Sequence, residues 1–143
     1  MTSFTLPPPE TPFGERVARR LRDDIVAWLT TVSVDGTPQP NPIWFLWDGA
    51  SFLIYSLPGA ARLGNIARNP HVSLNLEGNG RGGDIIVFTG TAHIAPDEPP
   101  ADQNALYLAK YRTAIDRNFG GAAAFAARYS TPIRFTPLKV RGN

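Results

Sequence analysis

The most informative stretch of this chain is Ser56-Leu57-Pro58-Gly59-Ala60-Ala61-Arg62-Leu63-Gly64-Asn65-Ile66-Ala67-Arg68-Asn69-Pro70. It follows an apolar run, residues 52–55, that is typical of a β-strand, and its Pro-Gly pair predicts a turn. A short helix is predicted after the turn, and it ends at Asn69 because the residue before a proline is disfavoured in a helix. Three apolar side chains fall on one face of this helix: Leu63, Ile66 and Ala67.

The start of this predicted helix suits an anion. A strand that passes through a glycine turn into a helix leaves backbone N–H groups unpaired, and such groups bind phosphate well. Arg62 lies in the first turn and Asn65 follows three residues later, so both side chains can project from the same helix end. The stretch therefore predicts a phosphate site; the alternative is a surface helix whose arginines are simply solvated.

Length and composition indicate one globular domain. The chain has 143 residues, of which 43% are hydrophobic and 18% are charged, with a net charge of +2. Its basic cluster, Arg16, Arg19, Arg20 and Arg22, is interrupted by apolar residues and followed by two aspartates, which is typical of the solvated face of a helix. We therefore expect no nucleic-acid partner. No signal peptide or long apolar span is present, so we expect a cytoplasmic protein without a membrane partner.

The side chains available for covalent or metal chemistry are few. The chain has no cysteine, which excludes disulfides, thiolate catalysis and cysteine-containing zinc motifs. His71 and His93 lie in apolar, strand-like runs without a second candidate ligand at a metal-binding spacing. The sequence therefore predicts structural histidines and no metal site.

The first half of the chain predicts antiparallel strands. A proline-rich arm, residues 1–13, is expected to lie over the fold or over a partner subunit, and a helix is expected at 14–23. Strands are predicted at 25–34, 39–47 and 51–56, joined by the Asp35-Gly36 and Asp48-Gly49 turns into a meander. Pro40 and Pro42 cannot donate ladder hydrogen bonds, so the second strand should begin at a sheet edge or against something other than a strand.

The second half completes a small barrel. Strands are predicted at 71–76, 85–94 and 132–140, with Gly90 marking a bulge or a close backbone approach. A glycine-rich loop covers 77–83. Helices are predicted at 102–117, with Leu108, Tyr111 and Ile115 on one face, and at 122–128. Six strands with short helices predict a mainly β, closed or nearly closed antiparallel barrel in a single domain, residues 14–143.

An ordered set of motifs carries a family resemblance over nearly the whole chain from residue 14. The set comprises Leu29-Thr30-Thr31-Val32, Asp35-Gly36-Thr37-Pro38-Gln39-Pro40, Trp47-Asp48-Gly49, Ser56 to Leu74, Thr89-Gly90-Thr91-Ala92, Tyr107-Leu108-Ala109-Lys110-Tyr111 and Pro132-Ile133-Arg134-Phe135-Thr136-Pro137. In this order the motifs resemble the six-stranded split β-barrel of the pyridoxamine-phosphate-oxidase-like, FMN-binding superfamily. Within it, the chain looks like the actinobacterial branch that uses the deazaflavin coenzyme F420.

The resemblance implies a homodimer with two cofactor sites, each built from both subunits. The family's phosphate-binding basic residue falls on Arg62, with Asn65 following it. Positions that line or approach the cofactor fall on Thr31, Gln39, Pro40, Asn41, Ser56 and Ala61. Ala60 stands where many relatives carry another basic residue, and the loop is one residue shorter. Arg68 either compensates for that charge or is a solvated residue at the helix end.

The resemblance also implies a function that agrees with the scarcity of catalytic side chains. Reduced F420 carries its own hydride, so the protein binds and orients the cofactor beside an unsaturated small molecule such as an enone, a quinone or a tetrapyrrole. Trp44 is either an apolar wall beside the cofactor ring or ordinary core, whereas Phe45 and Trp47 are expected in the core. Two alternatives remain: an FMN-dependent oxidase or reductase, and a non-enzymatic protein that binds a flavin, a deazaflavin or haem.

Overall fold

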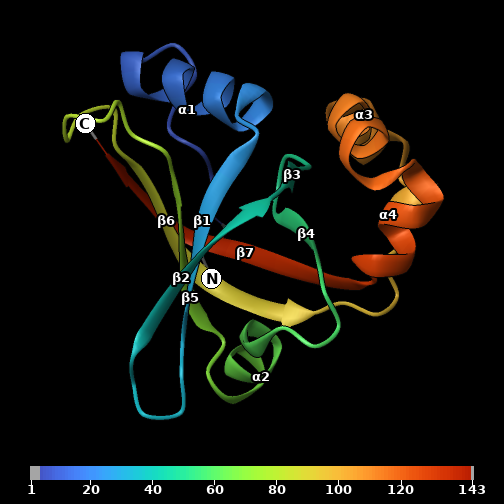
Figure 1. Ribbon diagram of the computed structural model, residues 1–143. Coiled ribbons are helices and arrows are strands. Elements are labelled where there is room, and N and C mark those ends of the chain that lie inside the picture. The colour runs from blue at the N-terminus through green and yellow to red at the C-terminus, as the bar shows by residue number, and fades with distance from the viewer. Residues whose placement is uncertain (1–3, 143) are drawn as a thin grey trace.

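A computed structural model describes residues 4–142 as one curled sheet surrounded by short helices (Figure 1). The elements are, in chain order, α1 (Pro12–Asp23), β1 (Val26–Val32), β2 (Pro38–Trp44), β3 (Leu46–Trp47), β4 (Phe52–Ser56), α2 (Ala61–Arg68), β5 (His71–Leu76), β6 (Ile86–Ile94), a 3-10 turn (Ala101–Gln103), α3 (Ala105–Phe119), α4 (Ala122–Arg128) and β7 (Thr131–Gly142). None of the helices in this described range is long and apolar enough to cross a membrane.

The sheet has the strand order β2-β1-β5-β6-β7-β4-β3, and every neighbouring pair is antiparallel. Its two edge strands, β2 and β3, are separated in the chain by Phe45 alone. The sheet must therefore curl until the end of β2 meets the start of β3 at Phe45, which makes the predicted split barrel. The strand count is seven and not six because the predicted strand 39–47 breaks at Phe45 and changes partner from β1 to β4. Pro40 and Pro42 lie in an edge strand, as predicted.

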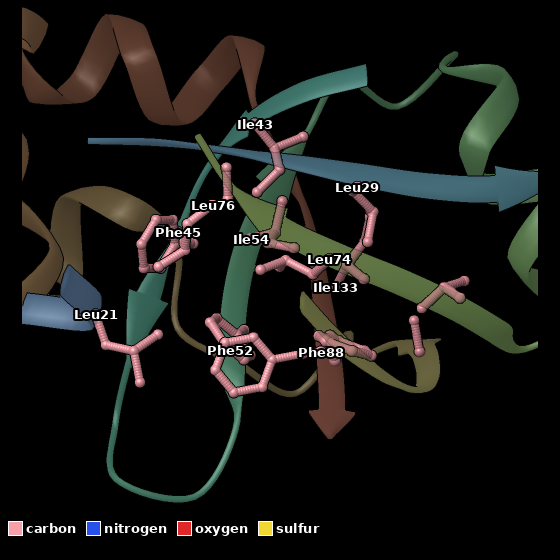
Figure 2. Packing of buried hydrophobic residues seen from close by; sticks show 14 of the residues in the cluster. Leu21, Leu29, Ile43, Phe45, Phe52, Ile54, Leu74, Leu76, Phe88 and Ile133 are labelled. Atoms are coloured by element: carbon pink, nitrogen blue, oxygen red, sulfur yellow. The ribbon is translucent and has the colours of Figure 1, made fainter. Parts of the chain in front are cut away.

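Alternation of side chains along the strands fills the barrel. The inward residues form one apolar cluster, in which Leu29, Phe45, Phe52, Ile54, Leu74, Phe88 and Ile133 are among the fully buried members (Figure 2). Phe52 stands at the centre of the aromatic contacts, with ring centroids 5.1 Å from Phe88 and 5.5 Å from Phe135. Burial of this much apolar surface is the main force that holds the curled sheet together.

A second apolar cluster lies outside the barrel. All five residues of β4 are buried because Phe52 and Ile54 face the barrel interior while Leu53 and Tyr55 face α3 and α4. The predicted face of α3, Leu108, Tyr111 and Ile115, is buried, and Tyr107 joins it. This helix begins at Ala105 and not at 102, because Asn104 accepts a hydrogen bond from the Tyr107 N–H at 3.0 Å and caps it. The helix predicted at 122–128 is confirmed as α4.

Helix α3 also fixes the strand break at Phe45. The Tyr111 hydroxyl accepts from the Phe45 N–H at 2.9 Å and lies 2.6 Å from the Ile25 carbonyl, to which it donates. The Lys110 ammonium donates to the Phe45 carbonyl at 2.9 Å and stands 3.7 Å from the centre of the Phe45 ring. Burial lowers the pKa of Lys110 to about 8. The backbone groups that leave the ladder at the break are thus satisfied by side chains of α3.

Helix α1 closes one end of the barrel. Thr11 caps it by accepting from the Gly14 N–H at 3.0 Å, so the helix starts at Pro12, two residues before the predicted start. The described part of the proline-rich arm, residues 4–13, packs against its own barrel, because Phe4 and Leu6 contact the barrel core. The Phe4 and Phe88 rings meet edge to face with centroids 6.3 Å apart. Residues 1–3 of the predicted arm lie outside the described residues.

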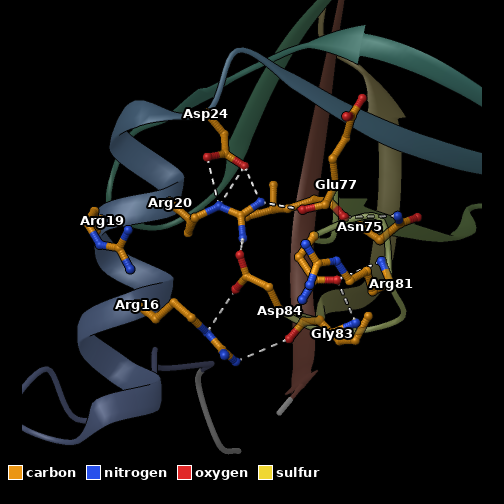
Figure 3. Close-up of polar contacts among 12 residues, drawn as sticks. Arg16, Arg19, Arg20, Asp24, Asn75, Glu77, Arg81, Gly83 and Asp84 are labelled. Atoms are coloured by element: carbon orange, nitrogen blue, oxygen red, sulfur yellow. Dashed lines mark hydrogen bonds and ion pairs between the residues drawn. The ribbon is translucent and has the colours of Figure 1, made fainter.

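The arginines of α1 are only partly solvated, which corrects the sequence-based expectation. Arg19 and Arg22 are exposed, but the Arg20 side chain is 12% exposed and pairs with both Asp24 and Asp84. Arg16 also pairs with Asp84, and Arg20 donates to the Glu77 carbonyl (Figure 3). These contacts tie α1 to the glycine-rich loop. Sequence reasoning missed them because Asp84 lies 64 residues from Arg20.

The bulge predicted at Gly90 is confirmed. The register between β6 and β7 shifts between Thr89 and Gly90. A Cβ atom at Gly90 would lie 2.1 Å from the Thr136 carbonyl oxygen, so the two backbones approach more closely than any side chain permits.

Candidate functional site

The junction between β4 and α2 has the predicted form. The strand ends at Ser56, residues 57–60 make a turn in which the Ala60 N–H donates to the Leu57 carbonyl at 3.3 Å, and α2 starts at Ala61. Ala60 offers no side-chain cap, so the first N–H groups of α2 are left without a side-chain partner from the cap position. The helix ends where predicted, with the Asn69 N–H bonded to the Asn65 carbonyl at 2.8 Å. Its inward face differs, because Ala67 is exposed and Asn65 is buried.

Asn65 organises a cluster of four of the predicted site residues: Thr31, Gln39, Asn65 and Arg68. Its amide nitrogen donates to Thr31 Oγ1 and to Gln39 Oε1, both at 3.0 Å. Its amide oxygen accepts from Arg68 at 2.7 Å. Thr31 and Asn65 are 1% and 4% exposed, Gln39 is partly buried and Arg68 is exposed, so the cluster runs from the buried Thr31–Asn65 pair out to the surface. The cluster fastens α2 to β1 and β2 and so sets the position of the helix start.

Arg62 takes no part in the hydrogen bonds of this polar cluster. It lines a cavity outside the barrel, so the structure separates it from Asn65, contrary to the expectation of a shared helix end. The ion pairs found among residues 4–142 do not include Arg62. Burial lowers its pKa. A half-buried guanidinium with no carboxylate beside it is electrostatically prepared for an anion.

The cavity next to Arg62 has a volume of about 320 Å³. It is lined by residues of strands β2 and β4 and of helices α3 and α4. Its aromatic wall includes Trp44, Tyr55, Tyr107, Phe125 and Tyr129; together with Arg62 we call this the aromatic cavity. Trp44 stacks on Tyr111 at 4.5 Å and on Phe125 at 5.6 Å between ring centroids. Trp44 therefore lies outside the barrel core and lines this cavity, whereas Phe45 is fully buried in the core and Trp47 packs against it.

Most of this cavity was missed by sequence reasoning. Tyr107, Phe125 and Tyr129 come from α3, α4 and the residue after α4, and they meet Trp44 and Tyr55 only through tertiary packing. The available signal was the spacing of Tyr107 and Tyr111, which share one face of a helix. That spacing alone does not tell a cavity wall from a packed core.

The remaining predicted site residues belong neither to the polar cluster around Asn65 nor to the wall of the aromatic cavity. Ser56 is fully buried and its hydroxyl donates to the Leu57 carbonyl at 3.0 Å. Ala61 is the exposed first residue of α2. Pro40 and Asn41 lie in β2 opposite Thr30 and Leu29, and Pro40 is exposed. Of all the predicted site residues, only Arg62 and Trp44 line the aromatic cavity.

Comparison with solved structures finds the same fold in proteins with several roles. An F420 reductase is 25% identical, with a TM-score of 0.62, over 86% of this chain and 94% of that chain. The haem storage protein of Vibrio cholerae is 16% identical, with a TM-score of 0.62, over 90% and 93%. A conserved hypothetical protein of Mycobacterium tuberculosis is 18% identical, with a TM-score of 0.67, over 99% and 88%.

Among curated proteins, no match is found. The sequence profile described as pyridoxamine 5'-phosphate oxidase, in contrast, matches residues 13–142, which include every strand and helix except the first residue of α1. The chain belongs to the pyridoxamine 5'-phosphate oxidase family.

Proposed function

We propose that this protein is an oxidoreductase that uses reduced coenzyme F420 to reduce an unsaturated small molecule. The observation that carries the proposal is the position of Arg62 at the start of α2 and beside an aromatic cavity. Arg62 is a half-buried cation that has no carboxylate partner among residues 4–142. The ordered motifs of the F420-using branch and the similarity to an F420 reductase support the same choice. The acceptor would be of the enone, quinone or tetrapyrrole type.

The role of the protein's own residues would be to bind and orient the cofactor. Arg62 and the first N–H groups of α2 would hold the phosphate group, and the polar cluster around Asn65 keeps that helix start in place. The aromatic wall would exclude water and present flat apolar surface. When bound, reduced F420 would supply the hydride from its own ring, so no nucleophilic side chain is required.

FMN is the second candidate cofactor, and one observation favours it. Arg62 lies in the first turn of α2, whose cap residue Ala60 offers no side-chain acceptor, and a cation at such a helix start suits the terminal phosphate of FMN. The deciding experiment titrates the purified protein with F420, FMN and haem side by side. Tightest binding of F420, with oxidation of the reduced cofactor by an enone or a quinone, supports the proposal. Tighter binding of FMN or haem overturns it.

Salt dependence gives a prediction on the cofactor choice. F420 carries a phosphodiester and a long anionic tail, which can draw on dispersed cations such as Arg68, Arg81 and Arg112. We expect its affinity to fall more steeply than that of FMN between about 0.1 M and about 1 M salt, where the Debye length drops from about 10 to about 3 Å. Equal slopes for the two cofactors, or a yellow protein that purifies with FMN, would speak against F420.

We also propose that the protein is a homodimer. The outer face of the sheet carries an open groove lined by Thr30, Val32, His71, Ser73 and Leu138, and Leu138 is 59% exposed. A two-fold interface can bury such a face against a second copy. The described part of the proline-rich arm packs on its own chain and therefore gives no support. We expect light scattering at micromolar concentration to give twice the 15.6 kDa chain mass; a single-chain mass would contradict the dimer.

A further inference from the structure

The hydroxyl group of Tyr107 is buried without a hydrogen-bond partner. Tyr107 is 0% exposed, and its hydroxyl is one of three buried side-chain polar atoms that have no hydrogen bond among the described residues. The other two, Arg16 Nε and Asp84 Oδ1, face each other in an ion pair at 3.3 Å. Tyr107 is therefore the exception, and buried hydroxyl groups without partners are rare in folded proteins.

Its tyrosine neighbours do not share this property. The Tyr55 hydroxyl donates to the Pro99 carbonyl at 2.7 Å, and the Tyr111 hydroxyl bonds to the backbone at Ile25 and Phe45. Tyr107 is held between them, with ring centroids 4.8 Å from Tyr55 and 4.9 Å from Tyr111. Burial raises the pKa of Tyr107, so its hydroxyl stays protonated and available as a donor.

Tyr107 also contributes to the cavity beside Arg62. Tyr107 belongs to the wall of the aromatic cavity, whose volume of about 320 Å³ lies at the lower end of the range of about 300–1,000 Å³ found for small-molecule pockets. The wall is largely aromatic, contains no acidic residue, and carries its one charge on Arg62. Such a wall packs well against a flat conjugated ring, and the positive charge of Arg62 disfavours a cationic ligand.

We propose that the aromatic cavity binds a flat conjugated ring that carries an oxygen substituent, and that the Tyr107 hydroxyl is the hydrogen-bond partner of this oxygen. Both a hydroxyaryl and an aryl carbonyl group have this chemistry. The ring can belong to a small substrate or to the cofactor. The cofactor case rests on the proposed function, whereas the site itself does not.

The test compares two ligands that differ by one oxygen, 2-naphthol and naphthalene, by calorimetric titration without any cofactor. In the wild-type protein we expect 2-naphthol to bind about tenfold more tightly, which is the contribution of one good hydrogen bond. In Tyr107→Phe the two ligands should bind equally, near the wild-type affinity for naphthalene. No preference in the wild-type protein, or a preference that survives in Tyr107→Phe, overturns the assignment.

Thermal unfolding with a matched control separates this role from a structural one. Tyr107→Phe removes a hydroxyl that has no partner, so the Tm should stay unchanged or rise. Tyr111→Phe removes a bonded hydroxyl from a neighbouring tyrosine that does not line the cavity, so the Tm should fall while the preference for 2-naphthol persists. A clear fall of the Tm in Tyr107→Phe would show that the hydroxyl has a partner within the fold and would overturn the proposal.

Titration of both variants with F420 and FMN identifies the source of the ring. Loss of cofactor affinity in Tyr107→Phe but not in Tyr111→Phe would place the cofactor ring in the cavity. Unchanged cofactor affinity, together with the lost naphthol preference, would place a substrate there. If neither cofactor binds the wild-type protein while 2-naphthol does, the proposed function fails and the aromatic site stands.

Discussion

Replacing Phe45 with alanine is expected to lower the free energy of unfolding by about 3–5 kcal/mol, as for a large aromatic side chain removed from a packed core. Phe45 is fully buried, and its ring contacts Phe52 at 5.7 Å between centroids. Its position adds a second reason for a large effect. Phe45 is the only residue between the two edge strands, so a cavity there loosens the closure of the barrel.

Urea denaturation measures this loss, with Val34→Ala as the control. Val34 is 81% exposed in the first hairpin, so its truncation should change stability by no more than about 0.5 kcal/mol. The Phe45→Ala variant should also weaken the contact with Lys110, whose ammonium stands over the Phe45 ring. A loss of unfolding free energy below about 1 kcal/mol would mean that the strand break at Phe45 tolerates a void. Closure of the barrel would then depend on the neighbouring hydrogen bonds instead.

Arg62→Ala is expected to weaken cofactor binding roughly tenfold to a hundredfold without destabilising the fold. A charge-assisted hydrogen bond to a phosphate is worth about 1.5–3 kcal/mol, which corresponds to that range of affinity. Stability should hold because the ion pairs found within residues 4–142 do not use Arg62, and burial of its charge is unfavourable to folding.

Arg117→Ala is the matched control for this experiment. Arg117 carries the same charge but lies exposed in the last turn of α3, so its removal changes the net charge equally while leaving the cavity intact. Calorimetric titration of F420 should give near wild-type affinity for Arg117→Ala. Equal affinities of the wild-type protein and a folded Arg62→Ala variant would remove Arg62 from the binding site.

Local signals predicted most of the fold. The Asp35-Gly36 turn, the break at Asn69-Pro70, the bulge at Gly90 and the helix at 122–128 depend on the conformational preferences of a few neighbouring residues, and the structure has all of them. The break at Phe45 gave no such signal. Residues 39–47 lack an interrupting glycine, and the strand changes partner because the curled sheet brings β4 to it.

The candidate site was predictable only where it is built from adjacent residues. The β4–α2 junction and Arg62 follow from one continuous stretch. The pairing of Asn65 with Thr31 spans 34 residues, and the cavity joins Trp44 to Tyr107 and Phe125. Such contacts depend on how α3 and α4 pack over β4. The hydrophobic periodicity within α3 or within α4 does not predict that packing.

The three prolines of β2 have a consequence for aggregation. Pro38, Pro40 and Pro42 alternate along an edge strand that pairs with β1 over its whole length, so their missing N–H donors all lie on the free side. The opposite edge, β3, is two residues long. Neither edge offers the row of donors and acceptors on which a foreign strand could grow, and amyloid-like strand addition is disfavoured at both.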